Sequence, residues 1–139
     1  MASITFDSFF AGLGAGAIVP STDTFYMLLV TASYTPNKGT HAKRSDVTNE
    51  VTGAGYTAGG QAVTMTVATN TTTHVWTMTP ATTAWSGSTI TARGAVIYKR
   101  RGGLASADEL VGYEDFGADI TSTAAAFTVT NSAALTITN

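Results

Sequence analysis

Three residues that lie close together in the chain have side chains of the types that can bind metal ions. His41 offers an imidazole nitrogen, and Asp46 and Glu50 offer carboxylates. Asp46 and Glu50 are four positions apart, so a helix would place both on one face, with His41 just upstream. The spacing matches no specific metal-binding pattern and favours a solvated helix face beside a loop histidine. We therefore predict neither a metal site nor any other cofactor.

The remaining groups with acid, base or nucleophilic chemistry are scattered. His74 begins an expected strand, where a histidine that makes one or two hydrogen bonds is more common than a catalytic base. Glu114 and Asp115 are adjacent, so a regular strand points them to opposite faces and they cannot act as the paired carboxylates of a glycosidase. No nucleophile-elbow motif accompanies the serines. We expect no enzymatic activity.

Basic residues gather in two places. The stretch SYTPNKGTHAKRSDVTNEVTGAGYTAGG, residues 33–60, interrupts runs of Thr, Val and Ala with Lys38, His41, Lys43 and Arg44. A second group, Lys99-Arg100-Arg101-Gly-Gly, is typical of a hairpin tip, either solvated or paired with an acidic partner surface. The net charge is nevertheless −2, which lacks the basic footprint that duplex nucleic acid requires.

The composition indicates one neutral, hydroxyl-rich domain. Charged residues make up 12% of the 139 residues, against about 25% in an average protein. Cysteine is absent, which excludes disulfides and thiolate sites. The apolar run from Phe9 to Val19 is shorter than the roughly 20 residues that cross a bilayer, and no basic segment precedes it as in a signal peptide. We expect no membrane partner.

Turn residues occur about every ten positions, and β-branched or aromatic residues fill the intervals, which predicts a single-domain, all-β sandwich. TFYMLLVT (24–31) is apolar on both faces and is expected to be a central strand. The long polar loop between this strand and the next is expected to carry a short helix of about two turns, capped by Ser45 and running from Asp46 to Val51. Further strands are expected at 61–68, 73–79, 89–99, 109–116, 125–130 and 134–138.

Residues 1–20 are expected to form an extended apolar arm, and residues 21–139 the sandwich. Glycines at 12, 14 and 16 weaken any helix in this segment. We expect the side chains of Phe6, Phe9, Phe10 and Leu13 to bury apolar area in a partner, and deletion of residues 1–19 to leave a folded domain. An alternative stays open, in which Ile4 and Phe6 pair in the sheet.

Four blocks resemble, in their order and spacing, the head decoration or cement proteins of tailed bacteriophages: SYTPNKGTH, DVTNEVTGAGYTAGG, WSGSTITARGAVIYK and GYEDFGAD. The resemblance covers roughly residues 25–139 and leaves out the first 20 residues. It implies a jelly-roll β-sandwich, made in the host cytoplasm, on the outer surface of the virion capsid. Its implied partner is the major capsid protein, whose neighbouring subunits it ties together without catalysis.

Two surfaces are expected to make such contacts. The charged loop from Asn37 to Glu50 is expected to dock on capsid or on a neighbouring copy. A homodimer is expected because symmetric dimers are the commonest closed assembly. The residues expected to contact capsid or another subunit are Phe6, Phe9, Phe10, Leu13, Asn37, Lys38, His41, Lys43, Arg44, Glu50, Arg100 and Arg101. The alternative function is a carbohydrate-binding module for the host surface, in which Trp76 and Trp85 stack on sugar rings.

Overall fold

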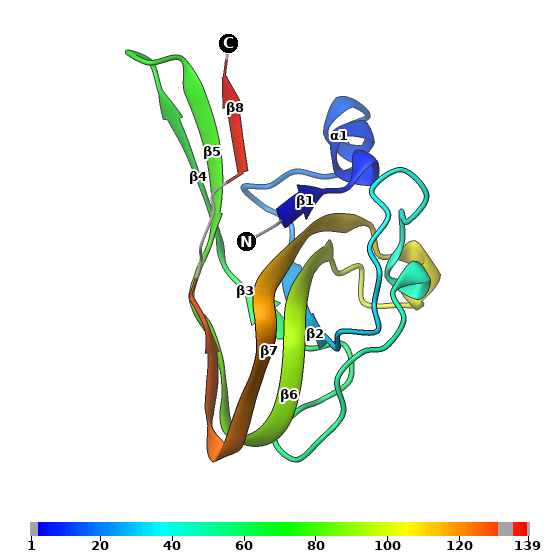
Figure 1. Ribbon diagram of the computed structural model, residues 1–139. Coiled ribbons are helices and arrows are strands. Elements are labelled where there is room, and N and C mark those ends of the chain that lie inside the picture. The colour runs from blue at the N-terminus through cyan, green and yellow to red at the C-terminus, as the bar shows by residue number, and fades with distance from the viewer. Residues whose placement is uncertain (1–2, 131–134, 139) are drawn as a thin grey trace.

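The computed structural model describes residues 3–130 and 135–138, which form two antiparallel sheets and one short α-helix (Figure 1). The larger sheet has the strand order β1-β7-β6-β2-β3, and the smaller has β4-β5-β8. The all-β prediction is confirmed, whereas the jelly-roll order of the strands stays a prediction. The elements are β1 (Ser3–Thr5), α1 (Asp7–Gly14), β2 (Phe25–Val30), η1 (Arg44–Asp46), β3 (Gln61–Val63), β4 (Met65–Asn70), β5 (Val75–Pro80), β6 (Thr83–Lys99), η2 (Ala105–Ala107), β7 (Leu110–Val129) and β8 (Leu135–Thr138), where η1 and η2 are single 3-10 turns.

Strand β2 is central, as its apolar sequence predicts. It pairs with β3 over Phe25 to Met27 and with β6 along its whole length. Alternate residues enter two different clusters, because successive side chains of a strand point to opposite faces. Phe25, Met27 and Leu29 join the cluster between the layers, while Leu28 and Val30 join a second cluster on the outer face. A strand covered on both faces is expected to be apolar on both, as β2 largely is.

Strands β6 and β7 are much longer than the sequence predicts. The expected strand 89–99 is the second half of β6, and the expected strands 109–116 and 125–130 are both parts of β7, although Glu109 and Thr130 lie outside it. The register shifts at four places, and Gly87 and Gly117 have φ angles of 58° and 80°. Bulges of this kind bend a strand without ending it. The pair therefore curves from one layer into the other (Figure 1).

The other expected strands are found with changed ends. The range 61–68 is divided between β3 and β4, and 73–79 corresponds to β5. The last expected strand corresponds to β8, although Ala134 lies outside the described residues. The predicted helix after Ser45 is wrong, because only the single turn η1 forms there. The backbone at Glu50 and Val51 bonds instead to the end of β2, where Val51 N donates to Leu29 O at 2.9 Å.

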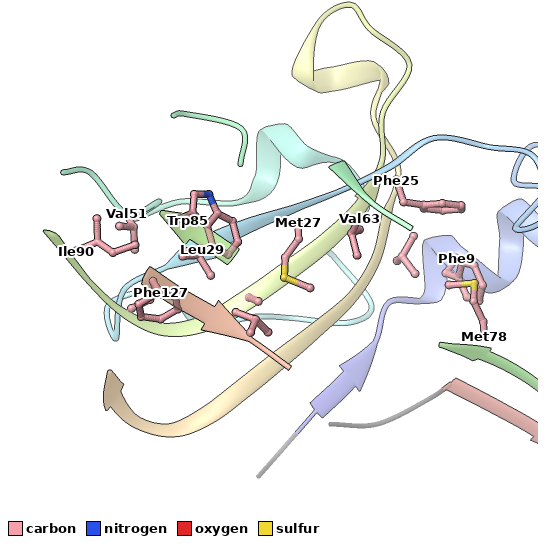
Figure 2. Packing of buried hydrophobic residues seen from close by; sticks show 14 of the residues in the cluster. Phe9, Phe25, Met27, Leu29, Val51, Val63, Met78, Trp85, Ile90 and Phe127 are labelled. Carbon is pink, nitrogen blue, oxygen red and sulfur yellow. The ribbon is translucent and has the colours of Figure 1, made fainter. Parts of the chain in front are cut away.

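The space between the layers holds the main hydrophobic core (Figure 2). Trp85 and Phe127 come from the ends of β6 and β7 that lie in the smaller layer, and their rings meet edge to face with centroids 6.3 Å apart. The second cluster, on the outer face of the larger sheet, contains Tyr34, Tyr98 and Tyr113 and is covered by the polar loop. Both clusters contain residues from the first 20 positions.

The free apolar arm predicted for residues 1–20 is wrong, since this segment is part of the folded structure. Ser3 to Thr5 pair with β7, as the open alternative proposed, and Phe6 and Phe9 are fully buried. Helix α1 forms despite its glycines because burial of Phe9 outweighs their low helix propensity. At Gly12 a Cβ atom would lie 2.5 Å from Cδ1 of Ile18, so glycine is what lets the following chain fold back against the helix.

Candidate interaction surface

Of the four arm residues expected to contact a partner, the structure exposes Phe10. Phe6 and Phe9 are 0% exposed, and Leu13 is partly buried against the main core. The Phe10 side chain is 47% exposed and touches the Phe9 ring at a centroid distance of 5.8 Å. Phe6 and Phe9 therefore stabilise this chain and cannot also be buried in a partner protein. This corrects the prediction for those two residues.

The start of the charged loop is held by a local turn and by a histidine contact. The side-chain oxygen of Asn37 accepts hydrogen bonds from the backbone N–H groups of Gly39 and Thr40, both at 3.1 Å. Asp7 N, at the beginning of α1, donates to Lys38 O at 3.0 Å. The His41 ring stacks on Tyr34, and its Nδ1 lies 3.0 Å from the Tyr34 hydroxyl. The Lys38 side chain remains exposed.

The next charges in the loop are paired within the chain. Arg44 Nε lies 2.8 Å from the Asp108 carboxylate, whose side chain is 1% exposed. The Glu109 carboxylate forms salt bridges with Arg101 at 2.7 Å and with Lys43 at 3.4 Å. Although burial raises the pKa of the Glu109 carboxyl, its hydrogen bond to Arg101 and the charge of Lys43 leave that pKa below its usual value. These pairs join the loop before β7 to the loop after β2.

The basic tip at Lys99 to Arg101 is bound to its own chain as well. Lys99 Nζ lies 2.8 Å from the Asp23 carboxylate and donates to Ala17 O at 2.5 Å. The Arg100 guanidinium lies 4.3 Å from the centre of the Tyr26 ring, within the range of a cation–π contact. The predicted pairing with an acidic partner surface is therefore replaced, for Lys99 and Arg101, by pairing inside the protein.

Glu50 and Asp46 fix the loop's backbone by accepting hydrogen bonds from it. The Glu50 carboxylate accepts hydrogen bonds from the Tyr56 hydroxyl at 2.7 Å and from Gly59 N at 2.6 Å. Asp46 Oδ2 accepts from the N–H groups of Ala42 and Lys43, both at 2.9 Å, which lowers the pKa of its carboxyl. Burial raises the pKa of Tyr56 well above its usual value, so this hydroxyl stays protonated and donates.

The distribution of charge along the folded chain is a feature that the sequence reasoning missed. All 7 basic and all 9 acidic side chains lie within residues 7–50 and 93–119. No charged side chain occurs in 51–92 or in 120–139. These two uncharged stretches supply β3, β4, β5 and β8 and the halves of β6 and β7 that lie with them. We call the layer formed by β4, β5, β8, the first half of β6 and the last part of β7 the uncharged layer.

The two faces of the uncharged layer differ in chemistry. Residues directly opposite each other in antiparallel strands point to the same face. On the inner face the register joins Val67, Met78 and Leu135 in one row and Thr69, Trp76 and Ile137 in the next. On the outer face most of the paired residues are Thr or Ala. They are Thr66, Thr79, Ala68, Thr77, Thr136, Asn70, Val75 and Thr138, continued by Ala84 and Thr128.

The β4–β5 hairpin extends beyond α1 and the larger sheet (Figure 1). Met78, near its base, is 2% exposed because it packs on the core, whereas Ile137 on β8 is 42% exposed. Near the tip, Trp76 and Ile137 line a shallow hollow together with Asn70 and His74. Trp85 is only 4% exposed and belongs to the core, so the two indoles have different environments. The tip thus presents apolar side chains that its own chain does not cover.

Among the described residues, no group of His, Cys, Asp and Glu side chains is arranged to hold a metal ion. His41, Asp46 and Glu50 each bond to a different part of the loop. In the same part of the chain, no helix has the length and apolar character needed to span a membrane. No family model, curated protein or solved structure matches this chain.

Proposed function

We propose that this protein is a structural protein of a bacteriophage virion, a sandwich of jelly-roll type that binds the outer surface of the icosahedral head. There it cements neighbouring major capsid protein subunits by non-covalent contacts. The observation that carries the proposal is the separation of charge described above. An uncharged layer with one small-residue face and one apolar face is the kind of surface that other proteins cover.

Cementing requires little affinity at each contact. A protein that touches two or three capsid subunits holds each of them near the next, so the second contact forms at a high effective concentration. The outer face of the uncharged layer, centred on Thr77, suits this task because its short side chains lose little conformational entropy when covered. Copies are proposed to associate as homodimers at two-fold positions.

The charged loop remains a second proposed contact. Within Asn37 to Glu50, the side chains of Lys43, Arg44 and Glu50 are engaged inside the chain. Lys38 is the exposed cation of this segment. Outside it, Arg100 is also exposed, and its guanidinium lies over the Tyr26 ring. We propose that this end of the molecule makes weaker, salt-sensitive contacts, because exposed charges are screened by ions.

The test is a pelleting assay with purified heads from which the protein has been stripped. We expect saturable binding of the wild-type protein and greater heat resistance of the heads that carry it. Thr77→Arg places a charge in the middle of the outer face, where docking would desolvate it, and we expect its occupancy to fall about tenfold or more. Thr77 is partly exposed, so the longer side chain can be accommodated in the free protein.

Ser106→Arg is the matched control. Ser106 is exposed in η2, at the charged end of the molecule, where the proposed contacts are weaker, so the same substitution should lower occupancy much less than Thr77→Arg. Circular dichroism and thermal melting of both variants establish that they fold. A folded wild-type protein that fails to bind stripped heads would contradict the proposal, and equal losses in the two variants would contradict the role of the outer face.

A second candidate, a carbohydrate-binding module of the virion surface, is favoured by the hollow at the hairpin tip. An indole beside Asn70 and His74 offers a stacking surface together with hydrogen-bonding groups, a combination that suits a sugar ring. Trp85 no longer supports this candidate, because it packs between Tyr56 and Phe127 in the core.

The sugar candidate predicts that host polysaccharide changes the fluorescence of Trp76 alone. In Trp85→Phe the remaining indole emission comes from Trp76, and quenching that saturates with polysaccharide would support the candidate. Trp76→Phe, with only the core indole left, is the matched control and should not respond. A Trp76 signal that stays unchanged throughout the titration excludes stacking at this hollow.

A further inference from the structure

Of the strands that end the two sheets in the described part of the structure, β4 is the longest. The strands at the ends of the two sheets are β1, β3, β4 and β8. Three of them are short, with 3, 3 and 4 residues, whereas β4 has 6. Its six residues pair with β5 in an unbroken register, and no described strand pairs with its other side. A row of backbone N–H and C=O groups is therefore available along β4.

The β4 edge lacks the features that prevent strand pairing in other proteins. Exposed edges are normally protected by charged side chains, by proline, by a bulge or by shortness. The sequence of β4, MTVATN, has no charge and no proline, and its register with β5 shows no bulge. The edge also stands on the hairpin that projects beyond α1 and the larger sheet (Figure 1). An edge in this state is suited to receive another strand.

We propose that the β4 edge pairs with the β4 edge of a second copy of this chain. Two-fold antiparallel pairing places each residue opposite its own copy or a near neighbour, so any charge in the strand would face a like charge. The uncharged strand satisfies this condition. It also keeps the apolar Met65 and Val67 on one face and Thr66 and Ala68 on the other, so a pairing centred on Val67 or Ala68 continues both faces.

Pairing at β4 would join two three-stranded sheets into one sheet with the order β8-β5-β4-β4-β5-β8. A pairing centred on Val67 would continue the apolar row of Val67, Met78 and Leu135 into the same row of the second copy, which covers surface that one copy leaves exposed. The outer faces would form one continuous uncharged surface for the capsid. The biological setting of this dimer rests on the proposed function, but its existence can be tested without heads.

The absence of cysteine makes a direct test possible, because one introduced cysteine can form a disulfide only between two copies. The variants are Val67→Cys and Ala68→Cys, at the two candidate centres of the pairing, with Thr136→Cys on the β8 edge as the matched control. Residues at the two-fold axis of antiparallel strands have Cα separations within the range that a disulfide spans. We expect one of the β4 variants to cross-link rapidly and the control to stay uncross-linked.

Sedimentation velocity of the full chain gives the second measurement. We expect the wild-type protein to be dimeric, and Ala68→Lys, at an exposed position on β4, to raise the dimer dissociation constant about tenfold or more. A wild-type protein that stays monomeric at the highest concentration, or a dimer that cross-links through Thr136→Cys instead, overturns the proposal. A wild-type monomer that still binds heads also overturns it while leaving the proposed function intact.

Discussion

Phe9→Ala is expected to lower the free energy of unfolding by about 3 to 5 kcal/mol, the usual cost of removing a buried phenylalanine ring. The Phe9 side chain is 0% exposed, and in Figure 2 it points from α1 toward Met78. The substitution removes this contact and leaves a cavity between the helix and the smaller layer. Small domains are stabilised by only about 5 to 15 kcal/mol, so a large part of the stability would be lost.

Phe10→Ala provides the matched control, one position along the same helix. Because Phe10 is 47% exposed, we expect its removal to cost about 1 kcal/mol or less. Urea unfolding followed by tryptophan fluorescence measures both variants, with the midpoint and slope compared with wild type. Equal midpoints for the two variants would show that α1 does not contribute to the core. By the same reasoning, removal of residues 1–19 should abolish folding, contrary to the expectation for a free arm.

Gly60→Ala is expected to cost about 4 kcal/mol or more, beyond the range of ordinary substitutions. Gly60 has a φ angle of 72° and immediately precedes β3. A Cβ atom at this position would overlap the carbonyl oxygen of Met27 and would lie 2.7 Å from the Leu28 Cα. Both obstacles are backbone atoms of β2, so relief requires β3 to move away from the central strand.

Gly102→Ala is the matched control, because it introduces the strain of a left-handed backbone without a steric overlap. Gly102 has a φ angle of 83°, and a Cβ atom there would meet no atom within 4 Å. Its substitution should cost about 1 to 2 kcal/mol, the strain of a left-handed alanine. Thermal and urea melts of the soluble fractions compare the two variants. A Gly60→Ala protein as stable as Gly102→Ala would mean that the approach of residue 60 to β2 is not tight.

Local sequence patterns predicted the strands but not their ends or their length. Strand β2 was predictable because its apolar character on both faces requires a covered, central position. The break expected between residues 116 and 125 does not exist, since a bulge at Gly117, whose N–H bonds to Asp115, bends β7 without ending it. The helix expected after Ser45 failed because Val51 pairs with β2, a contact that depends on the tertiary fold. Helix α1 was missed for a similar reason, as burial of Phe9 rather than propensity holds it.

The candidate site was less predictable than the fold. The cations of the polar loop were expected to face a partner, but Arg44 pairs with Asp108, which is 64 residues away in sequence. No local pattern contains that pairing. The uncharged stretches, in contrast, are visible in the sequence as two long runs without Asp, Glu, Lys or Arg. Their meaning depends on the register that brings β5 and β8 together, because only then do both runs form one surface.

The pairing of the first strand with the seventh sets an order of events during synthesis. Ser8, just after β1, donates a hydrogen bond to Leu110 O, 102 residues later in the chain. β1 and the side chains of Phe6 and Phe9 therefore cannot reach their final positions until β7 has left the ribosome. During that interval the β6–β7 ribbon has not formed, and the apolar side chains of residues 3–14 remain exposed to solvent. The segment that completes the core is thus made well before the strand that shelters it, which makes translation the period when the chain is most open to chaperones and to aggregation.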